Sequence, residues 1–246
     1  MLQTRLVHRA LKYRFRNDPL EIKTMLEHTP RDGVALDIGA HKGAYLWWLA
    51  RRVGSNGRAI GVEPQTELAD RLKTAYAKKP WVSIVNAAVS TESGSATLSI
   101  QGEGVSHGAT LRQVGEDVKD IRTTQVQTIS MSDLIDQQSV SRLDFIKCDA
   151  EGFERAIMQA GSDVLDRFRP SVLIECELRL GAGCQDPVGE LWDVFRPLGY
   201  DAKCFYNGDM IPIDSFEYST HQRDPDDKAH YGNNFILTHP EGPRAV

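Results

Sequence analysis

Residues 34–43 of the chain read Val-Ala-Leu-Asp-Ile-Gly-Ala-His-Lys-Gly. An apolar run with an acid near its end, followed by two glycines, predicts a buried strand, a tight turn and the start of a helix. A second apolar run at 58–62 ends in another acid, Glu63, which is followed by proline. The stretch therefore predicts two neighbouring parallel strands, with Asp37 and Glu63 near their carboxyl ends and a glycine turn between them.

Apolar runs and helical patterns alternate along the rest of the chain. This alternation predicts an α/β fold with a doubly wound, mostly parallel sheet of the Rossmann type, covered by helices on both faces. Strands are expected at residues 34–38, 59–63, 82–86, 145–149, 172–176 and 234–238, and helices at 44–53, 66–78, 153–166 and 187–195.

Two segments fall outside this alternation, and they set the predicted domain organisation. Residues 1–29 are expected to form a helical extension and 30–246 a single α/β domain, with a β insertion at its rim over 88–130. Leu2, Leu6, Arg9 and Tyr13 share one stripe of the N-terminal helix, which is also basic. We interpret this helix as packed on the main domain; the alternative is a helix on a membrane surface, next to a lipid-linked substrate.

Composition excludes several classes of protein. The chain has 246 residues, a net charge of −5 and a pI near 5.8, whereas a general nucleic-acid binder is usually basic. Its 4 cysteines form no C-x-x-C pair, so we expect reduced thiols and a cytoplasmic location. No run approaches the ~20 apolar residues of a membrane-spanning helix. Composition leaves the oligomeric state open.

The first motif, residues 37–43, has the features of a ligand-binding turn. Gly39 allows close approach of the backbone, and Gly43 allows the helix start to pack tightly. A carboxylate at Asp37 would crowd a pyrophosphate, but it suits the ammonium group of a methionine moiety. This points to S-adenosylmethionine. The alternative is an Asp37 that only caps the turn.

The ends of the second and third strands carry the next candidates. Glu63 can accept hydrogen bonds from the two hydroxyls of a ribose, although NAD enzymes place an acid at the same point. Glu63 could instead cap the helix that starts at Thr66. Asn86 and Ala87 close the third strand, where we expect the edge of an adenine.

The third motif, residues 145–152, reads Phe-Ile-Lys-Cys-Asp-Ala-Glu-Gly. Asp149 should point into the crevice beyond the strand ends, beside Glu175 at the end of the next strand. Two adjacent carboxylates share a proton or hold a cation. In the alternative reading, Lys147 neutralises one of them as a salt bridge.

Taken in order, these motifs resemble the FkbM family of S-adenosylmethionine-dependent methyltransferases. The matching stretches are 37–43, 62–64 and 147–152, together with the Ala-Val-Ser-x-x-x-Gly-like segment at 87–94. The resemblance spans roughly residues 33–178. It implies the class I fold, a seven-stranded sheet whose last strand, near residues 233–237, runs antiparallel. His41 stands where the family usually has asparagine, so it either contacts the cofactor or faces the acceptor as a base.

The resemblance also implies a function, which is O-methylation of a hydroxyl on a sugar, glycan or secondary metabolite. S-adenosyl-L-methionine would be the cofactor and S-adenosyl-L-homocysteine the product, and the motif does not require a divalent metal. The alternatives are an NAD(P)-dependent oxidoreductase and a non-catalytic cofactor-binding module. The expected cofactor-binding residues are Asp37, Gly39, Ala40, His41, Gly43, Glu63, Asn86, Ala87 and Asp149; the expected catalytic residues are Asp149, Glu175 and His41.

The acceptor is expected to be a small molecule or a glycan. Its pocket should come from the segments that the patterns describe least, at 102–115, 178–187 and 221–231.

Overall fold

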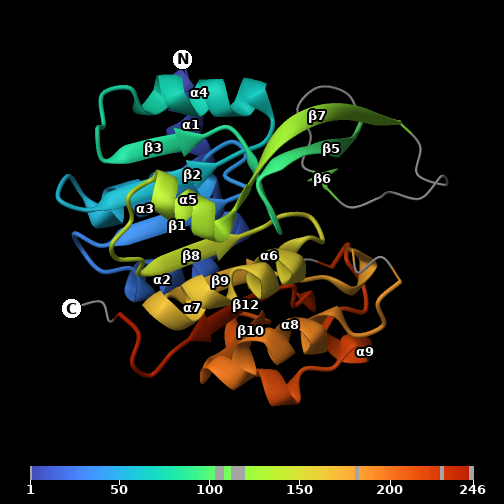
Figure 1. Cartoon of the computed structure of the whole chain (residues 1–246). Coiled ribbons are helices and arrows are strands. Elements are labelled where there is room, and N and C mark those ends of the chain that lie inside the picture. Colours follow the sequence, from blue (N-terminus) through green and yellow to red (C-terminus); the bar gives the residue numbers. More distant parts are fainter. Residues whose placement is uncertain (1, 103–107, 112–119, 181–182, 228–229, 244–246) are drawn as a thin grey trace.

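The computed structural model describes residues 2–102, 108–111, 120–180, 183–227 and 230–243. A central eight-stranded sheet has the strand order β11-β10-β12-β9-β8-β1-β2-β3. Figure 1 shows this sheet running through the middle of the molecule. Its strands are β1 (Val34–Ile38), β2 (Arg58–Val62), β3 (Val82–Val85), β8 (Phe145–Cys148), β9 (Ser171–Glu175), β10 (Asp201–Tyr206), β11 (Asp209–Pro212) and β12 (Asn234–Thr238).

The pairing of the strands confirms the predicted fold class. β9, β8, β1, β2 and β3 pair in parallel, each neighbour with the next. The last strand, β12, is antiparallel to both β9 and β10, as expected for the class I arrangement. The expected count of seven strands falls one short, because β11 folds back on β10 as a hairpin and extends the edge of the sheet.

Helices cover both faces of the sheet, since its central strands are apolar on both sides (Figure 1). On one face lie α1 (Leu2–Lys12), α2 (Pro19–His28), α3 (Ala44–Val53) and α4 (Thr66–Tyr76), with a π-helical turn, η1 (Tyr13–Asn17), between α1 and α2. On the other lie α5 (Met131–Gln137), α6 (Glu154–Ala160), α7 (Ser162–Phe168) and α8 (Pro187–Phe195).

The single helix predicted at 153–166 is in fact two helices, α6 and α7. They meet at Gly161, where a Cβ atom would lie 2.8 Å from Sδ of Met131. Because Gly161 has no Cβ, Met131 of α5 can pack against the junction between α6 and α7. Hydrophobic periodicity does not report such a contact, because it is made with a distant residue.

Residues 88–130 hold a second sheet with the strand order β4-β7-β5-β6. β5 (Gly94–Gln101) and β7 (Ile121–Ser130) form its long antiparallel pair, which extends away from the central sheet in Figure 1. β4 (Ala88–Ser90) and β6 (Ala109–Thr110) complete it. The predicted strands at 96–100 and 123–128 lie within β5 and β7. The division into an extension, a domain and an insertion stays a prediction.

The N-terminal segment packs on the main domain. The indole of Trp48 on α3 donates a hydrogen bond to the carbonyl of Ala10 at 2.9 Å, and Gln3 donates to the carbonyl of Ala75 at the end of α4. Leu6 is buried in the core between the sheet and these helices. Among the described residues, no helix combines the length and apolarity needed to cross a membrane.

Candidate active site

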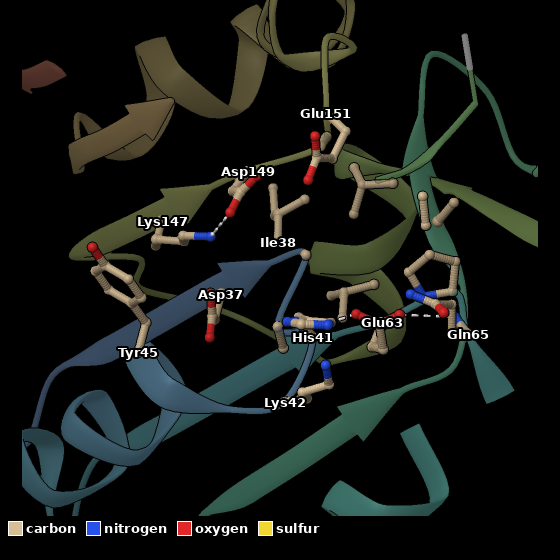
Figure 2. Close-up of a pocket in the computed structure, with 18 of the residues that line it drawn as sticks. Asp37, Ile38, His41, Lys42, Tyr45, Glu63, Gln65, Lys147, Asp149 and Glu151 are labelled. Atoms are coloured by element: carbon tan, nitrogen blue, oxygen red, sulfur yellow. Dashed lines mark hydrogen bonds and ion pairs between the residues drawn. The ribbon is translucent and has the colours of Figure 1, made fainter. Parts of the chain in front are cut away.

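A cavity of about 110 Å³ lies beyond the carboxyl ends of β1, β2 and β8. This is the position at which ligands bind in open α/β sheets. Figure 2 shows the acids Asp37, Glu63, Asp149 and Glu151 around it, together with Lys42 and Lys147. The lining includes most of the predicted cofactor-binding residues, namely Asp37, Gly39, Ala40, His41, Glu63, Ala87 and Asp149.

Asp37 is the most deeply buried acid of the cavity, with 1% of its surface exposed. Neither of its carboxylate oxygens has a hydrogen-bond partner of normal geometry among the described residues. Burial raises the pKa of Asp37 to about 6, against the opposing effects of Lys147 and the Leu46 amide. A buried carboxylate with spare acceptor capacity is costly, and a cationic ligand would relieve that cost.

Lys147 lies beside Asp37 in the β1–β8 register and forms an ion pair with Asp149 at 3.0 Å. Its ammonium also lies 5.2 Å from the ring centre of Tyr45. Burial favours the neutral amine, but the negative charges of Asp149 and Asp37 raise the pKa of Lys147. The salt bridge considered from the sequence is therefore present, and it fixes one oxygen of Asp149 at the cavity wall.

The two glycines of the first motif are both required by their surroundings. Gly39 has φ +75°, and a Cβ there would lie 1.9 Å from the carbonyl oxygen of Asp149. The backbone at Gly39 therefore lies directly against the backbone at the end of β8. Gly43, with φ +79°, directly precedes α3, and a Cβ there would lie 2.6 Å from Leu72 and 3.1 Å from Leu6. This is the tight packing predicted for the helix start.

Glu63 organises the turn after β1. One of its oxygens accepts the His41 amide at 2.7 Å, and the other accepts the Gln65 amide at 2.9 Å (Figure 2). Burial raises the pKa of Glu63 to about 7, while these two amides lower it. Gln65 precedes α4, but among the described residues no side chain caps that helix, so Glu63 orders the turn between β2 and α4. A carboxylate has about four lone-pair sites, so two remain for a ligand.

Asn86 does not lie on the cavity wall. Its side-chain amide donates to the carbonyls of Glu63 at 2.9 Å and Pro64 at 3.1 Å, which ties the β2 loop to the end of β3. Ala87, the next residue, does line the cavity, together with Leu98 of the second sheet. Asn86 therefore supports the loop, and the apolar side chains form the surface that an adenine could contact.

His41 occupies a left-handed backbone conformation, with φ +47°. Its amide contacts Glu63, and the residue lies on the wall between the first cavity and a second one beside α1. The side chain is partly buried at the boundary of the two cavities. Both of its predicted roles, in cofactor contact and as a base, stay predictions.

Glu151 is a cavity residue that the sequence motif contained but our expectations did not include. Burial raises its pKa to about 8, and the negative charges of Asp149 and Glu154 add to this effect. It adopts φ +52°, a conformation that is uncommon for residues other than glycine and that directs the chain around the cavity edge. The signal that could have found it is the acid two positions after Asp149.

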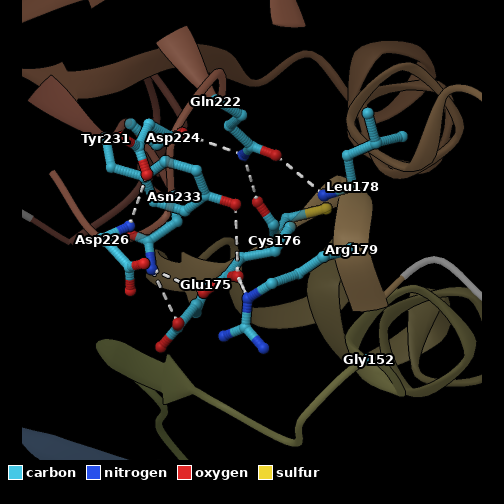
Figure 3. A network of polar contacts seen from close by, with 12 residues as sticks. Gly152, Glu175, Cys176, Leu178, Arg179, Gln222, Asp224, Asp226, Tyr231 and Asn233 are labelled. Carbon is cyan, nitrogen blue, oxygen red and sulfur yellow. Dashed lines mark hydrogen bonds and ion pairs between the residues drawn. The ribbon is translucent and has the colours of Figure 1, made fainter. Parts of the chain in front are cut away.

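Glu175 lies outside the first cavity, although β9 places it next to the end of β8. Figure 3 shows it in a separate polar network, where Asn233 donates to Glu175 at 2.7 Å and to Glu177 at 2.9 Å. Burial and the nearby Asp149 raise the pKa of Glu175, and Glu177 accepts its hydrogen bond. Arg179 completes the network through an ion pair with Glu177. Glu175 thus lies near Asp149, as expected, but its carboxyl is hydrogen-bonded in the Asn233 network while Asp149 pairs with Lys147.

The N-terminal segment contributes two residues that sequence reasoning did not place in the site. Arg9 of α1 and Tyr13 of η1 both line the first cavity, where Tyr13 packs edge-on against Tyr45 at 6.0 Å. π-Helical turns often occur at functional sites.

The other expectations concern the acceptor segments and a metal. Ala109 and Leu111, from the expected acceptor segment 102–115, line the first cavity, while 103–107 and 112–115 lie outside the described residues. Over the described ranges, no three His, Cys, Asp or Glu side chains are grouped as metal ligands.

The raised pKa values predict how stability depends on pH. Asp37, Glu63 and Glu151 have folded-state pKa values of about 6, 7 and 8, all above the ~4 of an unfolded carboxyl. The folded state therefore binds protons more tightly, and this stabilisation is lost as pH rises through those values. We expect urea unfolding of the unliganded protein to give about 4 kcal/mol less stability at pH 8 than at pH 6.

The control for this experiment is Glu151→Gln, which should flatten the decline between pH 7 and 8, since the amide cannot titrate. A free energy of unfolding that stays constant or rises from pH 6 to 8 would contradict the assignment of these buried carboxyls.

Comparison with known proteins identifies the family. Residues 37–202 match the family model described as the methyltransferase FkbM domain, which is more than half of the chain. A comparison with curated proteins returned no match.

Two solved structures share the fold at low identity. The first is the methyltransferase FkbM from Methylobacillus flagellatus KT, with a TM-score of 0.52, 12% identity, and coverage of 96% of this chain and 54% of that one. This chain thus spans about half of that protein. The second is cofactor-bound Rv0187 from MTB, with a TM-score of 0.51, 11% identity, and coverage of 98% and 90%.

Proposed function

Because the chain belongs to the FkbM methyltransferase family and has the class I methyltransferase fold, we propose that it transfers a methyl group from S-adenosylmethionine. The acceptor is a hydroxyl group of a sugar, a glycan or a secondary metabolite. One observation carries the cofactor assignment, namely the buried Asp37 carboxylate whose two oxygens lack hydrogen-bond partners of normal geometry among the described residues.

The residues of the first cavity fit the parts of this cofactor. Asp37 would hold the ammonium group of the methionine moiety, since an unpaired buried carboxylate is best stabilised by a positive charge. Glu63 would accept the ribose hydroxyls through its two remaining lone-pair sites. Ala87 and Leu98 offer an apolar surface to the adenine. A pyrophosphate would instead be repelled by Asp37, which disfavours the nicotinamide alternative.

The protein's own contribution to the reaction is alignment and proton transfer. The cofactor supplies a methyl group that is already activated by a sulfonium. Holding an acceptor oxygen in line with it can lower the barrier by roughly 7–11 kcal/mol. The acceptor hydroxyl must also lose its proton, and a carboxylate in the cavity wall can accept it, typically for ~10²–10⁴-fold in rate.

Asp149 is our first candidate for this base. Lys147 holds one of its oxygens at 3.0 Å, and about a third of its side chain remains exposed at the cavity. Glu151 is the second candidate, since a pKa of about 8 suits proton transfer near neutral pH. Glu175 is the weakest of the three because its carboxyl is held in the Asn233 network.

We therefore expect Asp149→Asn and Glu175→Gln to differ sharply. Asp149→Asn should lower kcat by about 10²–10⁴-fold and change the affinity for S-adenosylhomocysteine by less than about fivefold. Glu175→Gln, an equally conservative change outside the cavity, should alter kcat by less than about threefold. A larger loss of kcat in Glu175→Gln than in Asp149→Asn would reverse the assignment.

The experiment for the function itself has two steps. Calorimetry should detect binding of S-adenosylhomocysteine and no comparable binding of NAD. A panel of sugars, glycans and metabolites, incubated with methyl-labelled S-adenosylmethionine, should then yield a labelled ether. Cofactor binding with no transfer to any hydroxyl of a broad panel would favour a non-catalytic cofactor-binding module.

A further inference from the structure

A second cavity, of about 270 Å³, lies beside the first. It is bounded by α1, by the turn before α3 and by α4. Buried leucines on α1 and α4 form its floor, chiefly Leu6, Leu68 and Leu72. Of the predicted cofactor-binding residues, His41 alone lines this space.

Four cationic side chains line this cavity: Arg5, Arg9, Lys42 and Arg71. Arg71 forms an ion pair with Glu67 one turn earlier on α4, with both side chains about half exposed. Within the described parts of the chain, the other three form no ion pair with a carboxylate. Positive charge therefore exceeds negative charge around the cavity.

These cations are close enough to affect one another. Burial lowers the pKa of Lys42, and the positive charges of Arg9 and Arg71 lower it further. Arg9 also donates a hydrogen bond to the carbonyl of Lys42 at 3.5 Å, which holds α1 against the turn. Like charges gathered around a hollow repel one another, and an anion bound between them would remove that repulsion.

We propose that this second cavity binds a phosphate ester on the methyl acceptor. The phosphate would lie among the four cations, and the carbon chain attached to it would lie on the leucine floor. Arg9, His41 and Lys42 line both cavities, so a hydroxyl elsewhere on the same molecule can enter the first. This inference rests on the proposed function for its acceptor role and narrows the acceptor to a phosphorylated, partly apolar compound.

The test uses calorimetry on the full chain, at about 20 mM salt so that screening is weak. The probes are hexyl phosphate, inorganic pyrophosphate and the neutral hexyl glucoside. Hexyl phosphate should bind more tightly than pyrophosphate, because the leucine floor adds apolar contact, and the glucoside should bind most weakly. Pyrophosphate binding as tightly as hexyl phosphate would show that the floor plays no part and would overturn the ester assignment.

The variant is Arg5→Gln/Arg71→Gln, whose two positions line only the second cavity. This double variant should lower the affinity for hexyl phosphate at least about tenfold and should leave the affinity for S-adenosylhomocysteine within about twofold of the wild type. The matched control is Arg16→Gln/Arg31→Gln, which removes the same charge from exposed positions and should have less than about a twofold effect.

Three results would overturn the site: no binding of hexyl phosphate, an equal loss in the control variant, or glucoside binding as tight as phosphate binding. Hexyl phosphate should also bind to protein saturated with S-adenosylhomocysteine. Competition between the two would assign the cations to the cofactor and overturn the acceptor role. If S-adenosylhomocysteine did not bind at all, the proposed function would be refuted separately, because the titration with hexyl phosphate does not depend on cofactor binding.

Discussion

Asp37→Asn is expected to weaken the binding of S-adenosylhomocysteine at least about 30-fold and to leave the unliganded protein no less stable than the wild type. Losing one partner of a buried charge pair typically costs 2–5 kcal/mol of binding free energy. In the unliganded protein the same carboxylate is buried without normal hydrogen bonds, so a neutral amide removes a cost. Calorimetry and urea unfolding at pH 8 measure the two quantities.

Asp144→Asn provides the matched control. Asp144 is also fully buried, but one oxygen accepts the Val34 amide at 2.7 Å and the other pairs with Arg142 at 2.7 Å, ahead of β8. Its amide variant should lose about 1–3 kcal/mol of stability and keep its affinity for the ligand. If both variants lost stability and neither lost affinity, Asp37 would be a structural residue like Asp144.

Gly39→Ala is expected to have the second large effect, a loss of more than about 3 kcal/mol in the free energy of unfolding. A Cβ at this position would lie 1.9 Å from the carbonyl oxygen of Asp149, so the β1 turn and the end of β8 must move apart. The positive φ adds about 1–2 kcal/mol for any residue with a Cβ. Urea unfolding measures the loss, and ligand binding should fall with it because the turn carries the site.

Gly208→Ala separates the two contributions. Gly208 has φ +76° and no heavy atom within 4 Å of its would-be Cβ, so only the backbone penalty applies. We expect about 1–2 kcal/mol there. Equal losses in the two variants would mean that the contact between Gly39 and Asp149 is not tight.

Much of the fold could be predicted because its central strands are short apolar runs that end in acids or glycines. β1, β2 and β8 are buried on both faces, so their sequences show the pattern directly. The break at Gly161 and the β11 hairpin were not predicted. Both are fixed by tertiary contacts, with Met131 in the first case and the edge of the sheet in the second.

The site was predictable where a residue lies at or just after a strand end, as with Asp37, Glu63 and Asp149. Glu175 also ends a strand, but its carboxyl is hydrogen-bonded to Asn233 of another segment and does not line the first cavity. The sequence pattern placed Arg9 and Tyr13 on one stripe of the N-terminal helix. The pattern alone could not show that these two side chains line a cavity. Side-chain pairing across distant segments decides these cases.

The most direct measurement is a crystal structure of the complex with S-adenosylhomocysteine. The amino group of the ligand should lie within hydrogen-bond distance of the Asp37 carboxylate, and its ribose hydroxyls should contact Glu63. A nucleoside bound elsewhere, with Asp37 touching no part of it, would contradict the cofactor assignment.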